Sequence, residues 1–188
     1  MSPADPIALA ALIVRILDEL RIPYVIGGSV AASIYGEPRT TLDVDIMIDA
    51  EEKQVAALID RLENDFHVDR DDAVEAARQR SSFSAVHIDT TMKVDFFMTE
   101  RGSFASQQIA RGRKIRIAGN DLRFYSPEDI LIRKLMCYRS GGEQSDRQWR
   151  DVVGVMRTSK VDMMYLRSAA GQVGVTDLLE RVEKETQE

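Results

Sequence analysis

Residues 27–49 read GGSVAASIYGEPRTTLDVDIMID, a glycine pair followed by a helix-favouring segment and an acidic strand. Glycines let the backbone approach a phosphate closely, and a helix capped by Ser29 would offer free N–H groups at its N-terminus. Residues two apart in a strand share a face, so we expect Asp43 and Asp45 to project together. On these residues alone, the stretch is either a turn before a core strand or half of a triphosphate-binding site.

A second acidic motif, KVDFFM, lies at residues 93–98. Lys93 and Asp95 share a face there, and if this strand neighbours the first, Asp95 becomes a third carboxylate beside Asp43 and Asp45. Adjacent carboxylates repel one another and need a cation, and Mg²⁺ takes carboxylate oxygens together with substrate phosphates. We therefore predict that Asp43, Asp45 and Asp95 bind metal and carry out phosphoryl transfer.

Composition limits the class of protein. The chain has 188 residues, of which 44% are hydrophobic, so it is long enough for one core and too apolar to be disordered. It lacks an apolar run that could span a membrane, and residues 1–20 form an amphipathic segment interrupted by acids, unlike a signal peptide. We expect a cytoplasmic protein without a membrane partner. The single cysteine, Cys137, excludes an internal disulfide and a multi-cysteine zinc site, and we expect it to be buried.

The charge pattern leaves two interpretations of one basic patch. A net charge of -6 argues against binding of a nucleic acid over the whole surface. A local cluster of basic residues is either a solvated strand edge or an RNA contact, and it comprises Arg111, Arg113, Lys114, Arg116 and Arg123.

Hydrophobic periodicity predicts mixed helices and strands up to residue 125 and helices alone afterwards. The expected strands are 24–26, 43–48, 83–88, 93–98, 114–117 and 122–125, and the expected helices are 5–20, 29–35, 50–64, 71–80, 127–138, 148–158, 162–173 and one from 176. We predict an α+β protein in which domain 1–125 has a mixed central β-sheet flanked by helices. A small C-terminal helical lobe, 126–188, follows.

The motifs together resemble those of a known superfamily. GGS, DVD with its apolar tail and KVDFFM occur in the order found in the nucleotidyltransferase superfamily typified by DNA polymerase beta. RTTLDVDI, SPEDILIRKLMCYR and DRQWRDVVGVM look like the small prokaryotic branch that contains AbiEii-type nucleotidyltransferases. This resemblance covers about residues 20–160. It implies the nucleotidyltransferase fold and transfer of a nucleoside monophosphate from a nucleoside triphosphate to a hydroxyl, with two Mg²⁺ ions or, alternatively, Mn²⁺.

The resemblance also implies roles for individual residues. Asp43, Asp45 and Asp95 match the metal-binding carboxylates, and Asp95 also matches the acid that activates the acceptor hydroxyl. The implied nucleotide-binding residues are Gly28, Ser29, Lys93, Lys134 and Asp151, and from the residues themselves we add Gly27 and Arg39 as candidates. Three of these have structural alternatives: Lys134 as a solvent-facing helical lysine, Asp151 as an ion-pair partner of Arg147 or Arg150, and Arg39 as a loop stabiliser.

The acceptor is left open by the sequence. An RNA 3' end such as that of tRNA, a protein hydroxyl and a small molecule such as an aminoglycoside are the alternatives, and the resemblance also suggests a toxin-antitoxin system with a cognate partner. The helical lobe is small for a full AbiEii-type toxin, which puts the acceptor in doubt. Two other interpretations are an antitoxin-like or regulatory nucleotide-binding partner with little catalysis of its own, and a catalytically silent binding module.

Overall fold

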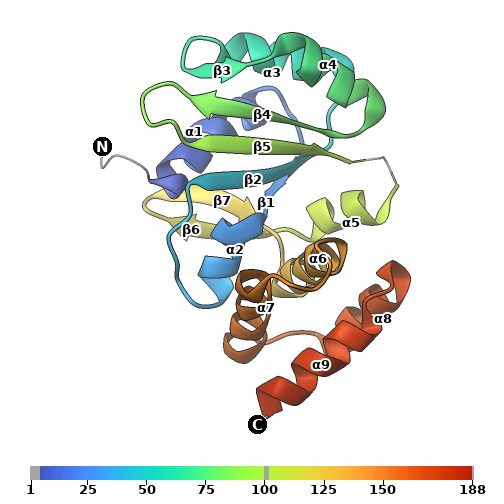
Figure 1. Cartoon of the computed structure of the whole chain (residues 1–188). Helices are drawn as coiled ribbons and strands as arrows, with labels where there is room; N and C mark the ends of the chain where they lie inside the picture. The colour runs from blue at the N-terminus through green and yellow to red at the C-terminus, as the bar shows by residue number, and fades with distance from the viewer. Residues whose placement is uncertain (1–4, 100–101, 188) are drawn as a thin grey trace. The chain divides into compact units, whose positions relative to one another are not determined.

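A computed structural model describes residues 5–99 and 102–187 (Figure 1). Contacts divide the chain into two compact units. The first comprises the chain up to Val30 together with Thr40–Phe124, and the second comprises Ala31–Arg39 together with the chain from Tyr125 onward. The short segment 31–39 thus belongs with the C-terminal helices, a grouping that the sequence did not suggest. The domain division between residues 125 and 126 stays a prediction.

The first unit is built on a seven-stranded mixed sheet with the order β3-β4-β5-β2-β1-β7-β6 (Figure 1). The pairs β2–β5 and β1–β7 are parallel, and the other neighbours are antiparallel. The strands are β1 Tyr24–Ile26, β2 Asp43–Ile48, β3 Phe66–Val68, β4 Ser82–His87, β5 Lys93–Met98, β6 Arg113–Ile117 and β7 Asn120–Phe124. The predicted α+β class with a mixed sheet flanked by helices is confirmed.

Three helices of this unit contact one another in sequence along the sheet: α1 Pro6–Glu19, α3 Glu52–Leu62 and α4 Arg70–Gln79. Alternation in the strands explains why they pack there, because the apolar residues of β2 and β5 point to one side and are buried. The opposite side of the same strands carries the acidic residues. The two remaining helices that begin in this unit are α2 Gly28–Tyr35 and α5 Phe104–Arg111.

The second unit contains α6 Pro127–Ser140, α7 Asp146–Thr158, α8 Met163–Val173 and α9 Thr176–Gln187. Ser126 caps α6, because its hydroxyl accepts a hydrogen bond from the Asp129 N–H at 3.2 Å and proline occupies the first turn. Trp149 is buried and packs against Tyr138, with ring centroids 5.1 Å apart.

One burial prediction is wrong: Cys137 is exposed. In α6 the side that packs into the unit carries Lys134, Leu135 and Tyr138, and Cys137 lies between these positions on the outer side. A small apolar residue was expected inside, but the helical phase places a lysine there instead. None of the described helices is both long enough and apolar enough to cross a membrane.

Two short elements were not predicted, β3 and α5. In β3, Phe66 alone is fully buried and His67 is exposed, so three residues give too little alternation to recognise a strand. In α5, the buried residues are Gln108 and Ile109, and a buried glutamine breaks the apolar pattern of an amphipathic helix.

Candidate active site

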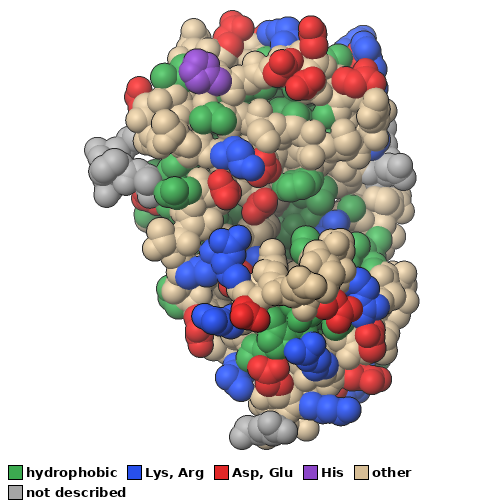
Figure 2. Space-filling view, viewed as in Figure 1, with side chains coloured by type: hydrophobic (Ala, Val, Ile, Leu, Met, Phe, Trp, Pro, Cys, Tyr) green, Lys and Arg blue, Asp and Glu red, His purple; other side chains and the backbone are tan. Residues whose placement is uncertain are grey.

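Parallel pairing of β2 with β5 brings the predicted acids of the first unit side by side. Asp43 lies opposite Lys93, and Asp45 lies opposite Asp95. Because paired residues point to the same side, all four side chains share the face that the apolar core leaves free. Figure 2 shows acidic side chains gathered with a basic one on the surface over β2 and β5. The condition set by the sequence, that the two acidic strands be neighbours, is therefore met.

The glycine pair lies directly against this face. The Gly27 N–H donates to the Asp45 carbonyl oxygen at 2.8 Å, which fixes the end of β1 beside β2. Gly28 begins α2 with a φ of +58°, and a Cβ built on it would lie 1.7 Å from Asp45 Oδ2. A side chain at position 28 would thus overlap the carboxylate. Ser29 follows in the first turn of α2, where backbone N–H groups lack helical partners and favour anions.

Lys93 holds the carboxylates together. Its Nζ forms an ion pair with Asp95 Oδ2 at 2.8 Å. The hydrogen bond to Asp95 raises the pKa of Lys93, partial burial opposes this shift, and the negative charges of Asp95, Asp43 and Asp45 add to it. The ammonium group therefore interacts electrostatically with all three carboxylates and offsets part of their mutual repulsion.

Ser84 is a site residue that the sequence reasoning missed. It lies opposite Asp95 in the antiparallel pair of β4 and β5, and its hydroxyl donates to Asp95 Oδ1 at 2.5 Å. Each Asp95 oxygen thus has a partner, Ser84 on one side and Lys93 on the other. The predicted strand 83–88 contained part of the signal, since alternation with the buried Phe83 and Ala85 places Ser84 on the polar face. The register that sets Ser84 opposite Asp95 could not be read from the sequence.

The donor set has the chemistry that Mg²⁺ prefers, three carboxylates on one face beside a backbone turn suited to phosphates. In the described part of the chain, however, no three acidic, histidine or cysteine side chains come together closely enough to hold a metal ion as they stand. The Lys93–Asp95 ion pair gives the physical reason. These residues fit a divalent cation provided that Asp95 exchanges its ion pair with Lys93 for the metal.

The second unit gathers the other predicted residues into a separate cluster. Arg39 Nε and Nη2 donate to the two oxygens of Asp151 at 3.0 and 3.1 Å, and Lys134 Nζ donates to Asp151 Oδ2 at 2.7 Å. The Asp151 and Lys134 side chains are 7% and 6% exposed, so the lysine is not the solvent-facing residue that one alternative described. Asp151 pairs with Arg39 and Lys134 and not with Arg147 or Arg150, which corrects the other alternative.

Asp151 is ionised because its two partners outweigh its burial. Desolvation pushes the pKa of Asp151 upward, but hydrogen bonds and positive charges from Arg39 and Lys134 lower it overall. The cluster of two cations and one carboxylate carries one net positive charge. Arg39 is also tied to its own segment, because its backbone N–H donates to the Ser33 hydroxyl at 3.4 Å.

The family described as "Nucleotidyltransferase of unknown function (DUF6036)" matches residues 7–186. This chain belongs to the DUF6036 nucleotidyltransferase family. The match spans both units and all the predicted site residues, so the superfamily named from the motifs is confirmed, whereas the AbiEii-like branch is not. No curated protein matches the chain.

Solved structures share the fold of this DUF6036 protein. An antigenic nucleotidyltransferase-like protein from Paracoccidioides brasiliensis has a TM-score of 0.58 at 19% identity, covering 97% of this chain and 93% of that chain. ANT(2")-Ia in complex with adenylyl-2"-tobramycin has a TM-score of 0.57 at 16% identity, covering 88% of this chain and 97% of that chain. The lincosamide antibiotic adenylyltransferase LnuA, lincomycin-bound, has a TM-score of 0.54 at 14% identity, covering 79% of this chain and 94% of that chain. At these identities the likeness establishes the fold.

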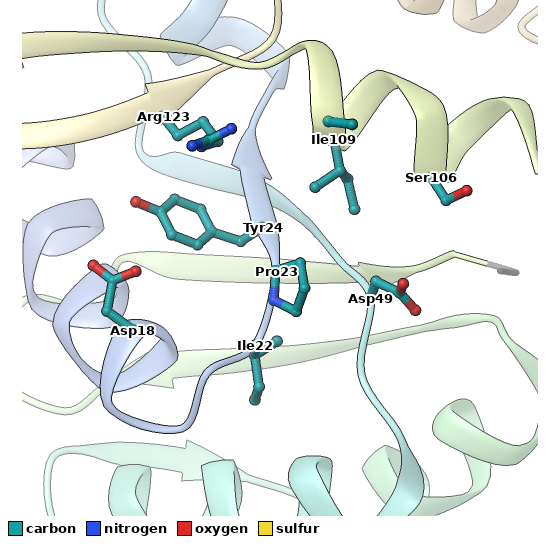
Figure 3. A pocket seen from close by; sticks show the side chains of 9 residues that line it. Asp18, Ile22, Pro23, Tyr24, Asp49, Ser106, Ile109 and Arg123 are labelled. Atoms are coloured by element: carbon teal, nitrogen blue, oxygen red, sulfur yellow. The ribbon is translucent and has the colours of Figure 1, made fainter. Parts of the chain in front are cut away.

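A cavity of about 370 Å³ in the first unit of this DUF6036 protein lies away from the predicted site residues. Figure 3 shows the Tyr24 ring between Asp18 of α1 and Arg123 of β7, at the opposite end of β1 from the glycine pair. Burial raises the pKa of Tyr24 to about 12, Asp18 adds to the shift, and Arg123 opposes it. The phenol is therefore neutral at physiological pH and is a structural element of this cavity wall.

Proposed function

We propose that this DUF6036 protein is a magnesium-dependent nucleotidyltransferase that moves a nucleoside monophosphate from a nucleoside triphosphate to a hydroxyl acceptor. The observation that supports the proposal most strongly is the register of β2 and β5, which aligns Asp45 with Asp95 beside the glycine pair. Three carboxylates next to a phosphate-binding turn match the requirements of metal-assisted phosphoryl transfer.

Each part of the first unit has a task in this reaction. Asp43, Asp45 and Asp95 would hold two Mg²⁺ ions, with Mn²⁺ as the alternative, which supply charge neutralisation for the phosphates and lower the pKa of the acceptor hydroxyl. Gly28 and Ser29 bind the phosphates through backbone N–H groups, and Gly27, whose own N–H is bonded to the Asp45 carbonyl, holds the turn in place for them. Asp95 takes up the hydroxyl proton, the hydroxyl oxygen forms a bond to the α-phosphorus, and the bond to the bridging oxygen breaks to release pyrophosphate.

The positive side chains bind the nucleotide in this proposal. With metal held by Asp95, Lys93 would be free to pair with the phosphates, for which a primary ammonium is suited. Arg39 and Lys134 are the nucleotide-binding side chains that we propose for the second unit, where Asp151 orients both of them. The net positive charge of this cluster suits an anionic ligand.

The acceptor and the cellular role extend this proposal. An RNA 3' end such as that of tRNA, a protein hydroxyl, or a small molecule like the antibiotics in the titles of the related structures would each supply the nucleophile. Lys114 and Arg116 both pair with Asp121, at 3.2 and 3.6 Å, which weakens the basic patch as an RNA contact. We further propose a cytoplasmic protein of the AbiEii-like branch, with a toxin-antitoxin partner as one cellular setting.

The decisive experiment incubates the purified protein with each of the four ribonucleoside triphosphates, labelled at the α-phosphate, in the presence of Mg²⁺. Separate reactions contain total tRNA, a cell protein extract or a small-molecule extract. Label in one of these fractions supports the proposal and names the acceptor class. A protein that binds nucleotide but moves no label would instead be the antitoxin-like or regulatory partner.

A further inference from the structure

The N-terminal half of β4 is an uncovered sheet edge. β3 pairs with His87, Val86 and Ala85, and its pairing ends there. Residues 82–84 therefore have β5 on one side and, within the described residues, no strand on the other. The cause is local: the chain leaves β3 at Asp69, which caps α4 through a hydrogen bond from the Asp72 N–H. Such an edge presents backbone donors and acceptors to another extended chain.

This edge borders a groove of about 430 Å³ whose charged lining residues are all acidic. Its walls are acidic residues of α4 and serines of the β4 edge, namely Asp69, Asp72, Glu75, Ser81, Ser82 and Ser84, with Ala76, Gln79 and Phe83 completing the lining. None of the lysines and arginines that the structure describes lines the groove. The volume lies in the range of pockets that take small ligands or short peptide segments.

The acids of the groove have little positive charge beside them, because the arginines of α4 pair mainly with acids on the side of α3. Arg70 pairs with Asp60 and Glu63 on the side of α3. Arg78 binds Glu52 of α3 at 2.7 Å and reaches Glu75 only at 3.6 Å. The Asp72 carboxylate forms no ion pair with any described residue. A partner with positive charge would therefore complement the groove, and a polyanion would be repelled.

The groove leads to the proposed catalytic acid through one residue. Ser84 lines the groove, and its hydroxyl donates to Asp95 at 2.5 Å. A chain that pairs with residues 82–84 would continue the sheet beyond β4, so alternate side chains of that chain would lie on the same face as Ser84 and Asp95. Ser84 would be the cross-strand neighbour of that chain, and Asp95 would lie two strand spacings, about 10 Å, from its backbone. Of the hydroxyl side chains, only tyrosine is long enough to reach across Ser84 toward Asp95.

We propose that the acceptor is a protein, and that a basic extended segment of it adds as a strand to residues 82–84 of β4. Backbone pairing with the edge supplies affinity, and lysines or arginines facing Asp72 and Glu75 supply selectivity. The inference rests on the proposed function for its chemistry: the segment's tyrosine hydroxyl gives its proton to Asp95, its oxygen bonds to the α-phosphorus, and the bond from the α-phosphorus to the bridging oxygen breaks to release pyrophosphate.

Binding in the absence of nucleotide tests the docking step by itself. The probe is a fluorescein-labelled hexapeptide of alternating lysine and valine with one central tyrosine, and its binding is followed by fluorescence anisotropy. Three comparison probes are the same peptide with alternate backbone nitrogens methylated, its glutamate-for-lysine counterpart and an RNA octanucleotide. The basic peptide is expected to bind best, because only it combines positive charge with free backbone donors.

A double variant and a matched control locate the binding. Asp72→Asn with Glu75→Gln should weaken peptide binding about fivefold, as expected for the loss of two exposed ion pairs. Asp89→Asn with Glu180→Gln removes the same charge from two exposed positions outside the groove and should leave binding unchanged. Equal binding of the methylated peptide, a preference for RNA, unchanged binding by the groove variant, or no binding up to the solubility limit of the peptide would each overturn the inference.

Transfer assays separate this inference from the proposed function. Asp95→Asn should still bind the peptide but should not label it with nucleotide. If the wild-type protein labels tRNA or a small molecule and leaves the bound peptide unlabelled, the protein-acceptor inference fails while the nucleotidyltransferase proposal stands. If the peptide binds at the groove and no acceptor of any class is labelled, the proposed function fails instead.

Discussion

Gly28 and Asp45 lie in direct contact, because a Cβ on residue 28 would fall 1.7 Å from the Asp45 carboxylate oxygen Oδ2. The Gly27 N–H bond to the Asp45 carbonyl fixes the same approach from the backbone. The glycine turn and the acidic strand are therefore one structural unit. A phosphate held by the turn would lie next to the carboxylate proposed to bind metal.

The first prediction concerns Gly28→Ala. The substitution forces Asp45 to move and strains a left-handed backbone, so nucleotidyl transfer should fall at least about a hundredfold and the free energy of unfolding should fall by more than about 1 kcal/mol. Gly119→Ala is the matched control, since Gly119 has a φ of +81° with no atom within 4 Å of the built Cβ. It should cost about 1 kcal/mol from backbone strain and leave transfer intact. Equal activity losses in the two variants would contradict the proposed contact.

A second prediction concerns competition between Lys93 and metal. In the proposed site Mg²⁺ would displace Lys93 from Asp95, so Lys93→Met should be less stable without Mg²⁺ but should bind Mg²⁺ at lower concentration than the wild type. Thermal unfolding with and without EDTA measures both effects, and saturating Mg²⁺ should raise the wild-type Tm by about 5 °C. Asp45→Asn should lose most of this rise. A Tm that does not respond to Mg²⁺ in the wild type would argue against metal binding by these carboxylates.

Ser84 is predicted to act by positioning Asp95. Ser84→Ala removes the hydrogen bond to Asp95 Oδ1, so kcat should fall about tenfold while the KM for the nucleotide stays unchanged. Ser84→Thr keeps the hydroxyl and should restore most of the rate. Steady-state kinetics of the three proteins checks this expectation. A rise in nucleotide KM without a change in kcat would instead place Ser84 in nucleotide binding.

The Arg39–Asp151–Lys134 cluster should make stability depend on acidic pH. Burial raises the pKa of Asp151, but its two cationic partners lower it overall, so its contribution is complete above the unfolded pKa of about 3.8 and is lost as pH falls through the folded value. Asp151→Asn should cost about 2 kcal/mol at pH 7, and this difference should shrink below about pH 4. Urea unfolding at several pH values measures it. Asp146→Asn, an exposed substitution in the same helix, serves as the control, and a pH-independent gap between Asp151→Asn and the wild type would contradict the expectation.

The sequence predicted the central elements well because their signals are local. Alternation at the start of DVDIMI and KVDFFM, followed by an apolar end, placed β2 and β5 at their observed bounds. Their pairing was only a condition of the predicted site, and the structure meets it. The glycine pair and Asp45 were recognised as site residues, but their contact was not, because close approach of a backbone depends on the sheet register.

The features that were not predicted depend on contacts between residues far apart in the sequence or on the orientation of a helix. Arg39 and Asp151 are separated by 112 positions, so no local pattern indicates their ion pair, and nearer arginines were the natural expectation. Cys137 was expected inside and Lys134 was expected in solvent as one alternative, yet the structure reverses both. The ion pair with Asp151 explains the burial of Lys134, and the helical phase of α6 explains the exposure of Cys137.

The central claim is that Asp45 and its neighbouring carboxylates catalyse nucleotidyl transfer, and one comparison of transfer rates tests it most directly. Wild-type protein and Asp45→Asn are incubated with α-labelled triphosphates, Mg²⁺ and cell extract, and the label is counted in RNA, protein and small-molecule fractions. The wild type should label one fraction, and Asp45→Asn should fall at least about a hundredfold below it. Equal labelling by both proteins, or no transfer by the wild type with any nucleotide, would contradict the account.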